Sequence, residues 1–458
     1  MPDQEKNLNI KKLALHDYRC FANIEISFHK QLTVLVAANG EGKTSILDAV
    51  AVALGPFIGS FDEGIGKHFL PKDIRLLRVR ETATNEMEYA PQGVRLEATG
   101  NIPGSVLEEL DIAPTWERSL AGPGKKTTIK GTKELIGYAK RLQRAVRTPG
   151  EKVTLPLLAY YGTGRLWQHK KLTLGKLPRK SRTIGYSDCL DPASSYKSFV
   201  AWFRYWSTNS LKAQIDAYKS GQSNIPTEFD QFIRSVSGAV DVCLEPVGWK
   251  NITYSLGREE LVAHHEIHGE LSVDILSDGI RNMIGMVADI AFRATKLNPD
   301  FGPCAASMTP GIVLIDEVDM HLHPAWQQVV VQSLTKAFPK LQFIVTTHSP
   351  QVLTTVPREN IRVIELTESG YQARMPDFSP LAHESGDALA KVMRTHREPP
   401  LPIQEQIRQF EQLVRAGLEA SDEAKELGTI LSDEGYQIHD SDLATWRFLA
   451  SRKSDKTG

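Results

Sequence analysis

A short glycine-rich segment constrains the fold of this chain more than any other feature of its sequence. The segment Ala37–Thr44 reads AANGEGKT, and it lies between an apolar run, Leu32–Val36, and a run with helical spacing, Ser45–Leu54. The uninterrupted apolar run predicts a buried strand, and the run after the loop predicts a helix packed against a sheet. Strand, glycine-rich loop and helix in this order predict an α/β fold with a phosphate-binding loop.

Within this loop, the residue types suit the binding of a triphosphate. Gly40 and Gly42 allow the backbone to approach the phosphates, while backbone N–H groups and the positive end of the following helix attract their charge. Lys43 is expected to reach the β- and γ-phosphates, and the hydroxyl of Thr44 to ligate Mg²⁺. The usual G-x-x-x-x-G-K-[ST] pattern is broken at Ala37, which matters only if that position needs positive φ. The predicted ATP contacts of the loop are Asn39, Gly40, Gly42, Lys43, Thr44 and Ser45.

A second motif, which is acidic, lies far from the loop in the sequence. Four apolar residues followed by two acids, Ile312–Glu317, place carboxylates at the carboxyl end of a buried strand, where ligands of open α/β sheets bind. Asp316 is expected to hold Mg²⁺ through water, and Glu317 to orient or deprotonate the attacking water. In isolation this is only an acidic strand end, but together with the phosphate loop it predicts an ATP site.

Two further elements complete the candidate site. Ser277 and Gly279 lie in the segment LSDGIR at the start of a predicted helix, where a hydroxyl and a backbone N–H form an anion nest, although a simple helix cap predicts the same residues. His348 follows the buried strand Leu341–Val345, where an imidazole can sense the γ-phosphate. A lone histidine is more often structural, so the functional role predicted for His348 rests on its position at the predicted sheet edge.

The composition excludes several classes of protein. Among 458 residues, 54 Lys+Arg balance 55 Asp+Glu, so the chain does not coat nucleic acid by charge alone. A polar N-terminus and the lack of long apolar runs predict no secretory signal, no membrane partner and a cytoplasmic location. The four cysteines are scattered without a CxxC pair, which predicts neither a disulfide framework nor a zinc knuckle.

The rest of the chain divides into a large domain and an appendage. We expect an ATPase domain over 1–385, with insertions at roughly 56–152 and 168–240, and a helical interaction region over 386–458 with two amphipathic helices. The aromatic cluster that includes Trp202 and Trp206 is interpreted as core or interface and not as a platform for base stacking. Short strands are predicted over Val242–Pro246, Ile252–Leu256 and Glu260–Ile267.

The order of these motifs, with a long insertion after the first, resembles the ATP-binding-cassette (ABC-type) ATPases of the structural-maintenance, Rad50 and RecF kind. The resemblance implies an α/β fold with a mixed central sheet, and a homo-oligomer in which Ser277 and Gly279 complete the ATP site of the opposing subunit. The segment Tyr18–Phe21 resembles the part of that family beside the adenine and phosphates, which makes Arg19 a candidate contact.

The segment Asp316–Gln327 resembles the defence-associated branch of this family, which includes the overcoming-lysogenisation-defect proteins. Further stretches resemble the ATPase subunit of the Septu anti-phage systems, whose close relatives accompany retrons: they are 158–167, 185–191 and the segment from Gly386 onward. This resemblance implies an HNH endonuclease partner that docks on the C-terminal region. It also leaves nucleic acid and a retron reverse transcriptase with its RNA–DNA as further partners.

Two alternative functions stay open. A nuclease in its own right, like the overcoming-lysogenisation-defect proteins, would have Asp440 and Asp442 as its candidate acids, but a Toprim domain needs more chain and more acids than remain. A DNA-repair ATPase that acts at ends or gaps is the other alternative. His321 and His323 alternate with no third ligand nearby, so we interpret them as the segment after the acidic strand end and not as a zinc site.

Overall fold

The computed structural model describes residues 7–78, 86–105, 113–166, 181–192, 196–221, 226–395, 401–436, 443–445 and 447–448. Its contacts form two compact units, Met1–Met393 and Arg394–Gly458. The functional division into 1–385 and 386–458 stays a prediction. Asp440 and Asp442, the candidate acids of a nuclease, lie outside the described residues.

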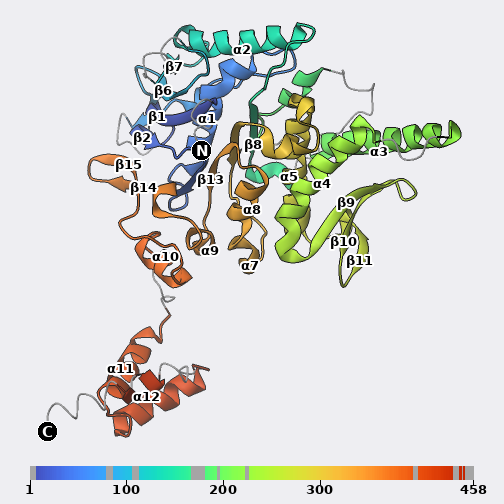
Figure 1. The fold of residues 1–458 in the computed structure, drawn as a ribbon. Helices are drawn as coiled ribbons and strands as arrows, with labels where there is room; N and C mark the ends of the chain where they lie inside the picture. Colours follow the sequence, from blue (N-terminus) through green and yellow to red (C-terminus); the bar gives the residue numbers. More distant parts are fainter. Residues whose placement is uncertain are drawn as a thin grey trace. The chain divides into compact units, whose positions relative to one another are not determined.

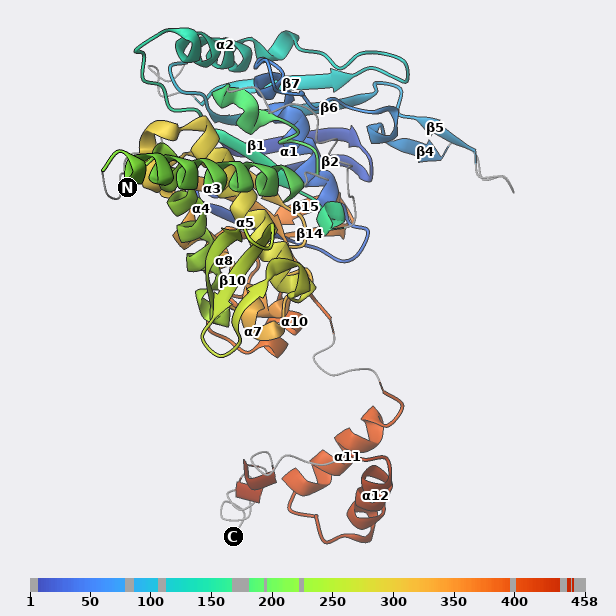
Figure 2. The ribbon, with the colours of Figure 1, turned by 90° about the vertical axis from the view of Figure 1, so that its right-hand side faces the viewer.

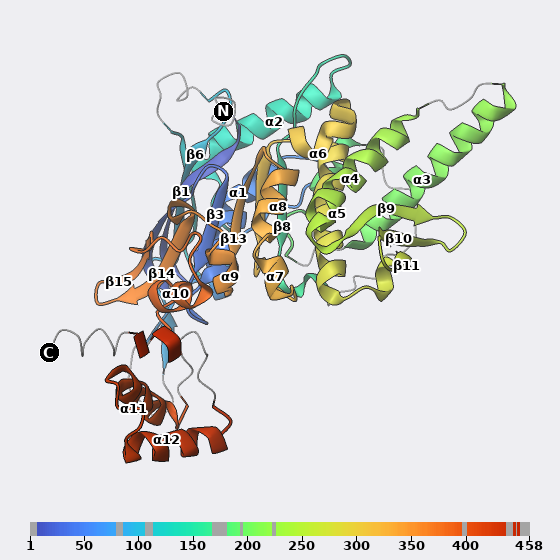
Figure 3. The same ribbon diagram turned by 60° about the horizontal axis from the view of Figure 1, so that its bottom comes forward.

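A six-stranded mixed sheet forms the centre of the first unit (Figure 3). In spatial order its strands are β15 (Gly370–Arg374), β14 (Ile361–Thr367), β3 (Leu32–Val36), β13 (Leu341–Thr346), β12 (Gly311–Ile315) and β8 (Leu157–Tyr161). All neighbours pair in parallel except β14 and β15, which are antiparallel. The buried strands predicted around the phosphate loop and the acidic motif are confirmed, and every residue of β3, β12 and β13 is buried. Parallel order brings the carboxyl ends of β3, β13 and β12 to one edge.

Helix α1 (Lys43–Ile58) packs between this sheet and a second, antiparallel sheet (Figure 1). The strands of the second sheet, in spatial order, are β2 (Phe21–Ser27), β1 (Asn9–Tyr18), β6 (Val94–Asn101) and β7 (Thr115–Leu120). The short hairpin of β4 (Leu76–Arg78) and β5 (Met87–Tyr89) lies beside it (Figure 2). Burial on both sides explains why α1 is apolar around nearly its whole circumference.

A helical layer covers the β8 side of the unit (Figure 1). It contains α3 (Tyr196–Lys219), α4 (Glu228–Leu244) and α5 (Asp278–Leu297). Trp206 packs against Phe232 of α4 and Phe292 of α5, with ring centroids 5.3 and 5.6 Å apart, so the aromatic cluster is core, as expected. A small antiparallel sheet adjoins α4: β9 (Trp249–Ser255), β10 (Glu260–His265) and β11 (Gly269–Ser272).

The strand predicted over Val242–Pro246 is wrong. Helix α4 continues to Leu244 and is followed by a 3₁₀ turn, Glu245–Val247. Val236, Val240 and Cys243 are buried at helical spacing, so packing of one helix face overrides the β-propensity of a short apolar run. Helix α2 (Lys133–Arg147), which lies within the first predicted insertion, was not predicted.

The remaining helices are short. In the first unit they are α6 (Ala305–Met308), α7 (Pro324–Gln327), α8 (Val330–Ala337), α9 (Pro350–Leu353) and α10 (Ser385–Lys391). The second unit contains α11 (Gln404–Arg415) and α12 (Asp422–Asp433), which pack on each other as the predicted helix pair. Within the described ranges, none of the helices has the length and apolar character that crossing a bilayer requires.

A partly buried lysine in the helical layer generates a stability prediction. Burial lowers the pKa of Lys296 to about 8, and its ammonium lies 3.8 Å from the ring centroid of Trp202. Since the unfolded chain holds this proton up to a higher pH, the lysine lowers stability below pH 8, and stability rises as the pH increases from about 8 towards 10. We expect Lys296→Met to raise the free energy of unfolding at pH 7 by about 1–2 kcal/mol, because the cation–π contact that it loses offsets part of the gain.

Urea unfolding of the wild type and of the variant, at pH 7 and pH 10, measures this difference. The advantage of the variant should shrink at pH 10, and an advantage of equal size at both pH values would contradict the assignment. Lys219→Met, at the exposed end of α3, is the matched control.

Candidate nucleotide-binding site

The phosphate loop has the backbone geometry that its two glycines permit. Gly40 and Gly42 have φ angles of 83° and 87°, whereas Ala37 does not have positive φ, so the departure from the usual motif causes no backbone strain. A Cβ at Gly42 would lie 2.3 Å from Cζ of Phe21, which excludes any other residue for steric reasons as well. The loop N–H groups and the first turn of α1 lie at the carboxyl end of β3.

Lys43 is buried at the inner side of this loop. Its Nζ donates hydrogen bonds to the backbone oxygens of Ala37 and Ala38, at 2.9 and 3.1 Å, and its side chain forms no ion pair with a described carboxylate. Burial lowers the pKa of Lys43, although nearby carboxylates, Asp316 foremost, act to raise it. A buried ammonium bonded only to carbonyl groups has its charge available for an anionic ligand.

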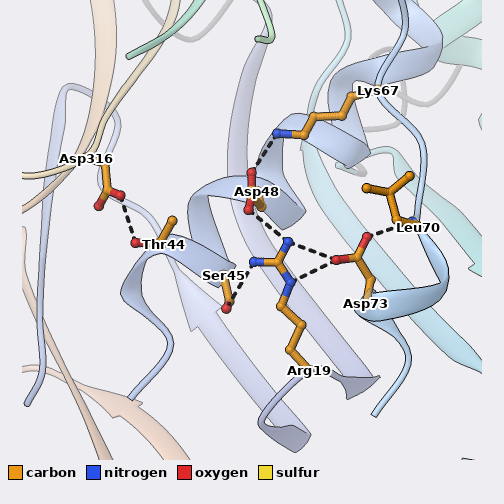
Figure 4. A network of polar contacts seen from close by, with 8 residues as sticks. All are labelled: Arg19, Thr44, Ser45, Asp48, Lys67, Leu70, Asp73 and Asp316. Carbon is orange, nitrogen blue, oxygen red and sulfur yellow. Dashed lines mark hydrogen bonds and ion pairs between the residues drawn. The ribbon is translucent and has the colours of Figure 1, made fainter. Parts of the chain in front are cut away.

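The side chain of Asp316 joins three segments of the site. Its two carboxylate oxygens accept hydrogen bonds from the hydroxyls of Thr44, at 2.8 Å (Figure 4), and of Thr346, at 2.7 Å. The same Thr346 oxygen accepts from the N–H of Glu317, at 2.7 Å. The predicted metal ligands Thr44 and Asp316 are therefore adjacent, and a hydroxyl with a buried carboxylate is a donor set that suits Mg²⁺.

Glu317 has a backbone conformation that is uncommon for its residue type. Its φ angle is 49°, in the left-handed region, and the bonds of Glu317 and Val318 to Thr346 hold it there. His348 lies just after β13, where Thr347 bonds to Asp319 at 2.5 Å and Ser349 bonds to Gln327 at 2.7 Å. These bonds fix the backbone on both sides of His348.

Arg19 has partners that its predicted role did not include. Its guanidinium pairs with Asp73 at 2.8 Å and Asp48 at 2.9 Å, and it donates to Oγ of Ser45 at 3.3 Å (Figure 4). Lys67 pairs with Asp48 at 2.6 Å. Burial alone would raise the pKa of Asp48, but Lys67 and Arg19 together hold it below its ordinary value. Arg19 thus touches the phosphate loop through Ser45, and its direct contact with a nucleotide stays a prediction.

This ion-pair network was missed by sequence reasoning. Asp48 lies one helical turn after Ser45, a local signal that could have identified it. Asp73 and Lys67 come from a segment with no motif, so no pattern in the sequence predicts that they meet Arg19.

The predicted signature residues lie on another element. Ser277 is the exposed N-cap of α5, and its side chain makes no capping hydrogen bond. Gly279 is buried against the segment after the acidic strand, because a Cβ there would lie 2.4 Å from the backbone oxygen of His321. Helix α5 packs on α3, α4 and β8, and no hydrogen bond between described residues connects Ser277 to the phosphate loop. The structure therefore joins the loop, Asp316 and Glu317, but it does not join Ser277 to them within one subunit.

A buried polar chain, also missed by sequence reasoning, connects the site to α5. The backbone N–H of Asp316 donates to the carbonyl of Tyr161, at 2.8 Å, and the hydroxyl of Tyr161 donates to Asp289 of α5, at 2.7 Å. Arg293 pairs with the same carboxylate oxygen and donates to the backbone of Gly185. The end of β8 is thus bonded both to the acidic motif and to the helix that begins at Ser277.

Comparisons with known proteins find ATPase families and relatives. One family model, "AAA domain", matches residues 12–225, and another, "AAA domain, putative AbiEii toxin, Type IV TA system", matches residues 261–354. The chain is 26% identical over 470 residues to the "Retron Vc95 probable ATPase" of Vibrio cholerae, which covers 92% of this chain and 86% of that protein. It is 25% identical over 489 residues to the "Retron Ec83 probable ATPase" of Escherichia coli, covering 93% and 83%.

Other similarities are shorter or weaker. A stretch of 75 residues is 45% identical to the "Septu protein PtuA" of Bacillus mycoides, covering 16% of this chain and 10% of that protein. The solved "SMC head domain from Thermotoga maritima" aligns with a TM-score of 0.43 at 15% identity, over 81% of this chain and all of that one.

The chain is an ATPase with an α/β fold, as the motif order predicted, and two separate AAA-domain models match the parts that contain the phosphate loop and the acidic motif. Two retron probable ATPases are among its relatives over most of its length, and it also shares stretches with PtuA proteins.

The position of Lys43 generates a binding prediction. We expect Lys43→Ala to weaken ATP binding by about 100-fold or more, because the variant removes a charge-assisted contact to the phosphates and leaves their charge uncompensated. Isothermal titration calorimetry with ATP and Mg²⁺ measures the change. Lys336→Ala, on α8, is the control and should bind ATP as the wild type does. Unchanged affinity in the Lys43 variant would contradict the role of the loop.

Proposed function

We propose that this chain binds ATP with Mg²⁺ at the loop of Lys43 and that two copies assemble head to tail, each closing the site of the other with Ser277. The observation that carries this proposal is the bond between Thr44 and Asp316, which brings the loop and the acidic motif together across 272 residues of sequence. Such an arrangement suits a site for a nucleotide triphosphate and its metal.

Each residue of the site would have a separate task in ATP hydrolysis. The loop N–H groups and Lys43 would bind the β- and γ-phosphates, while Thr44 and Asp316 would hold Mg²⁺, which offsets the charge of the phosphates. Glu317 would orient the attacking water and accept its proton, since its strained backbone places a carboxylate directly after the metal ligand. His348 would contact the γ-phosphate from the neighbouring strand end.

The exposed position of Ser277 supports a role for a second copy in the site. Ser277 carries an exposed hydroxyl at the N-terminus of a 20-residue helix, where the helix dipole favours an anion. Because no hydrogen bond among the described residues joins it to Lys43, a neighbouring copy is the source of the contact in our proposal. ATP would then stabilise the assembled state by its differential affinity, so that it regulates assembly as well as being hydrolysed.

The named relatives favour a role in anti-phage defence over a role in DNA repair. Retron and Septu proteins are among the relatives, and we propose that this chain is the ATPase subunit of a prokaryotic defence complex. In this proposal it assembles and regulates an HNH endonuclease, which docks on the unit that contains α11 and α12. Nucleic acid, and a reverse transcriptase with its RNA–DNA, are further proposed partners.

The task proposed for Glu317 predicts a separation of binding from hydrolysis. Glu317→Gln should bind ATP as the wild type does but hydrolyse it about 100-fold or more slowly, because the amide does not accept the proton of the attacking water. The rate of phosphate release measures hydrolysis. The mass of the complex in the presence of ATP measures assembly, and the variant should accumulate as an ATP-bound dimer. Glu368→Gln, in the turn between β14 and β15, is the control. Normal turnover in the Glu317 variant would exclude this base.

The docking proposal predicts a separable C-terminal function. A chain truncated after residue 398 should bind ATP with unchanged affinity, because every residue of the candidate site precedes that point. It should no longer co-purify with the proposed HNH nuclease partner. Arg408→Ala, a surface substitution on α11, keeps the unit intact and is compared with the truncation as a milder change to the proposed docking unit. Co-purification of the truncated chain would refute docking on this unit.

A further inference from the structure

A cavity lies at the edge of the central sheet opposite the candidate nucleotide site. Its volume is about 440 Å³, within the range of small-molecule sites. His29 and Lys30 line it just before β3, and Glu359 and Arg362 line it where β14 begins. Because β3 and β14 are parallel, the cavity lies at their amino ends, whereas the phosphate loop follows the carboxyl end of β3.

Arg362 carries a buried positive charge on one wall of this cavity. The side chain is 9% exposed, and its Nε and Nη1 donate to the backbone oxygens of Ser27, Glu359 and Ile361, at 2.7 to 2.8 Å. No described carboxylate pairs with it, and burial lowers the pKa of Arg362 without making the guanidinium neutral near pH 7. Its Nη2 group has no hydrogen bond to a described residue, so two N–H donors are available to a ligand.

Two lysines add to this charge. Lys11 and Lys30 line the same cavity, are exposed and form no ion pair in the described part of the chain. Lys11 lies in a β-bulge, where the register of β1 on β6 shifts between Ile10 and Lys12. A bulge redirects a side chain from the regular alternation of a strand. The neighbouring Lys12, outside the cavity, pairs with Glu25 at 2.7 Å.

Buried amide side chains hold the cavity wall in place. Gln342, at the amino end of β13, bonds to the backbone N–H and oxygen of Ile10, at 3.0 and 2.7 Å, and to the backbone oxygen of His29, at 3.1 Å. Asn360 donates to Nδ1 of His29 at 2.9 Å. Because Nδ1 accepts this bond, Nε2 of His29 carries the proton of the neutral ring and is a donor. The donors of this wall are therefore held by the same strands that form the nucleotide site.

We propose that this cavity binds the phosphate group of a nucleotide unit. The three cations Lys11, Lys30 and Arg362 face one carboxylate, Glu359, so the cavity has a surplus of positive charge that suits a phosphate. Glu359 provides an acceptor for an exocyclic amino group. The half-exposed thioether of Met375 provides an apolar wall for a base. The unit is either a free nucleotide or the phosphorylated end of a single strand.

The test uses the full-length protein in the Lys43→Ala background, so that binding at the ATP site does not contribute. Fluorescence anisotropy compares three probes: a single-stranded oligonucleotide with a 5′-phosphate, the same strand without it, and a fluorescent mononucleotide. We expect the double variant Lys11→Ala/Lys30→Ala to weaken the affinity for the probe by about 10-fold or more at low salt, and to reduce the salt dependence of binding. Lys12→Ala removes an adjacent lysine outside the cavity, and it should change affinity by no more than about twofold.

The outcomes separate the two sources of the phosphate. Preference for the phosphorylated strand supports a strand end, and preference for the mononucleotide supports a free nucleotide, provided that the double variant loses that binding. If no probe binds, or if Lys12→Ala weakens binding as much as the double variant does, the proposal is overturned. Failure here leaves the proposed ATPase function intact, since the nucleotide site is disabled throughout.

Discussion

The carboxylate of Asp316 is the point on which the candidate site depends. It is buried, with 3% of its surface exposed, and hydroxyls from two other segments, Thr44 and Thr346, donate to its two oxygens. A buried carboxylate is costly unless it is hydrogen-bonded, and both donors are available only when β3, β13 and β12 lie in this parallel order. The same contact therefore stabilises the fold and places the proposed metal ligand beside the phosphate loop.

Two polar networks extend from this point in different directions. Arg19, with Asp48 and Asp73, ties the first turns of α1 to the second sheet, so the helix that positions Lys43 is held from outside as well as by its apolar faces. On the other side, Tyr161 is bonded to Asp316 through the backbone and to Asp289 through its hydroxyl. Because Asp289 lies on α5, whose N-cap is Ser277, these bonds connect the proposed metal ligand to the helix at which a second copy would dock.

Local patterns predicted much of this site, and long-range contacts account for what they missed. The glycine-rich loop and the acids after an apolar strand are continuous motifs whose chemistry can be interpreted without a fold, and the strands and helix around them were predicted correctly. The partners of Arg19 come from unpatterned segments, so only the folded chain brings them together. The close approach of Gly279 to His321 also depends on packing between elements that are far apart in the sequence. The wrong strand at Val242–Pro246 shows the same effect, since burial of one face of α4 decided its conformation.

The central claim, that each site is shared between two copies, is tested most directly by mixing two inactive variants. Lys43→Ala removes the phosphate contact, and Ser277→Arg blocks the contact offered to the partner. In a head-to-tail pair of the two variants, one of the two sites combines an intact loop with an intact Ser277. Mixing should therefore restore ATPase activity to about a quarter of the wild-type level for random pairing of equal amounts. A mixture that stays as inactive as its separate components would contradict the shared site.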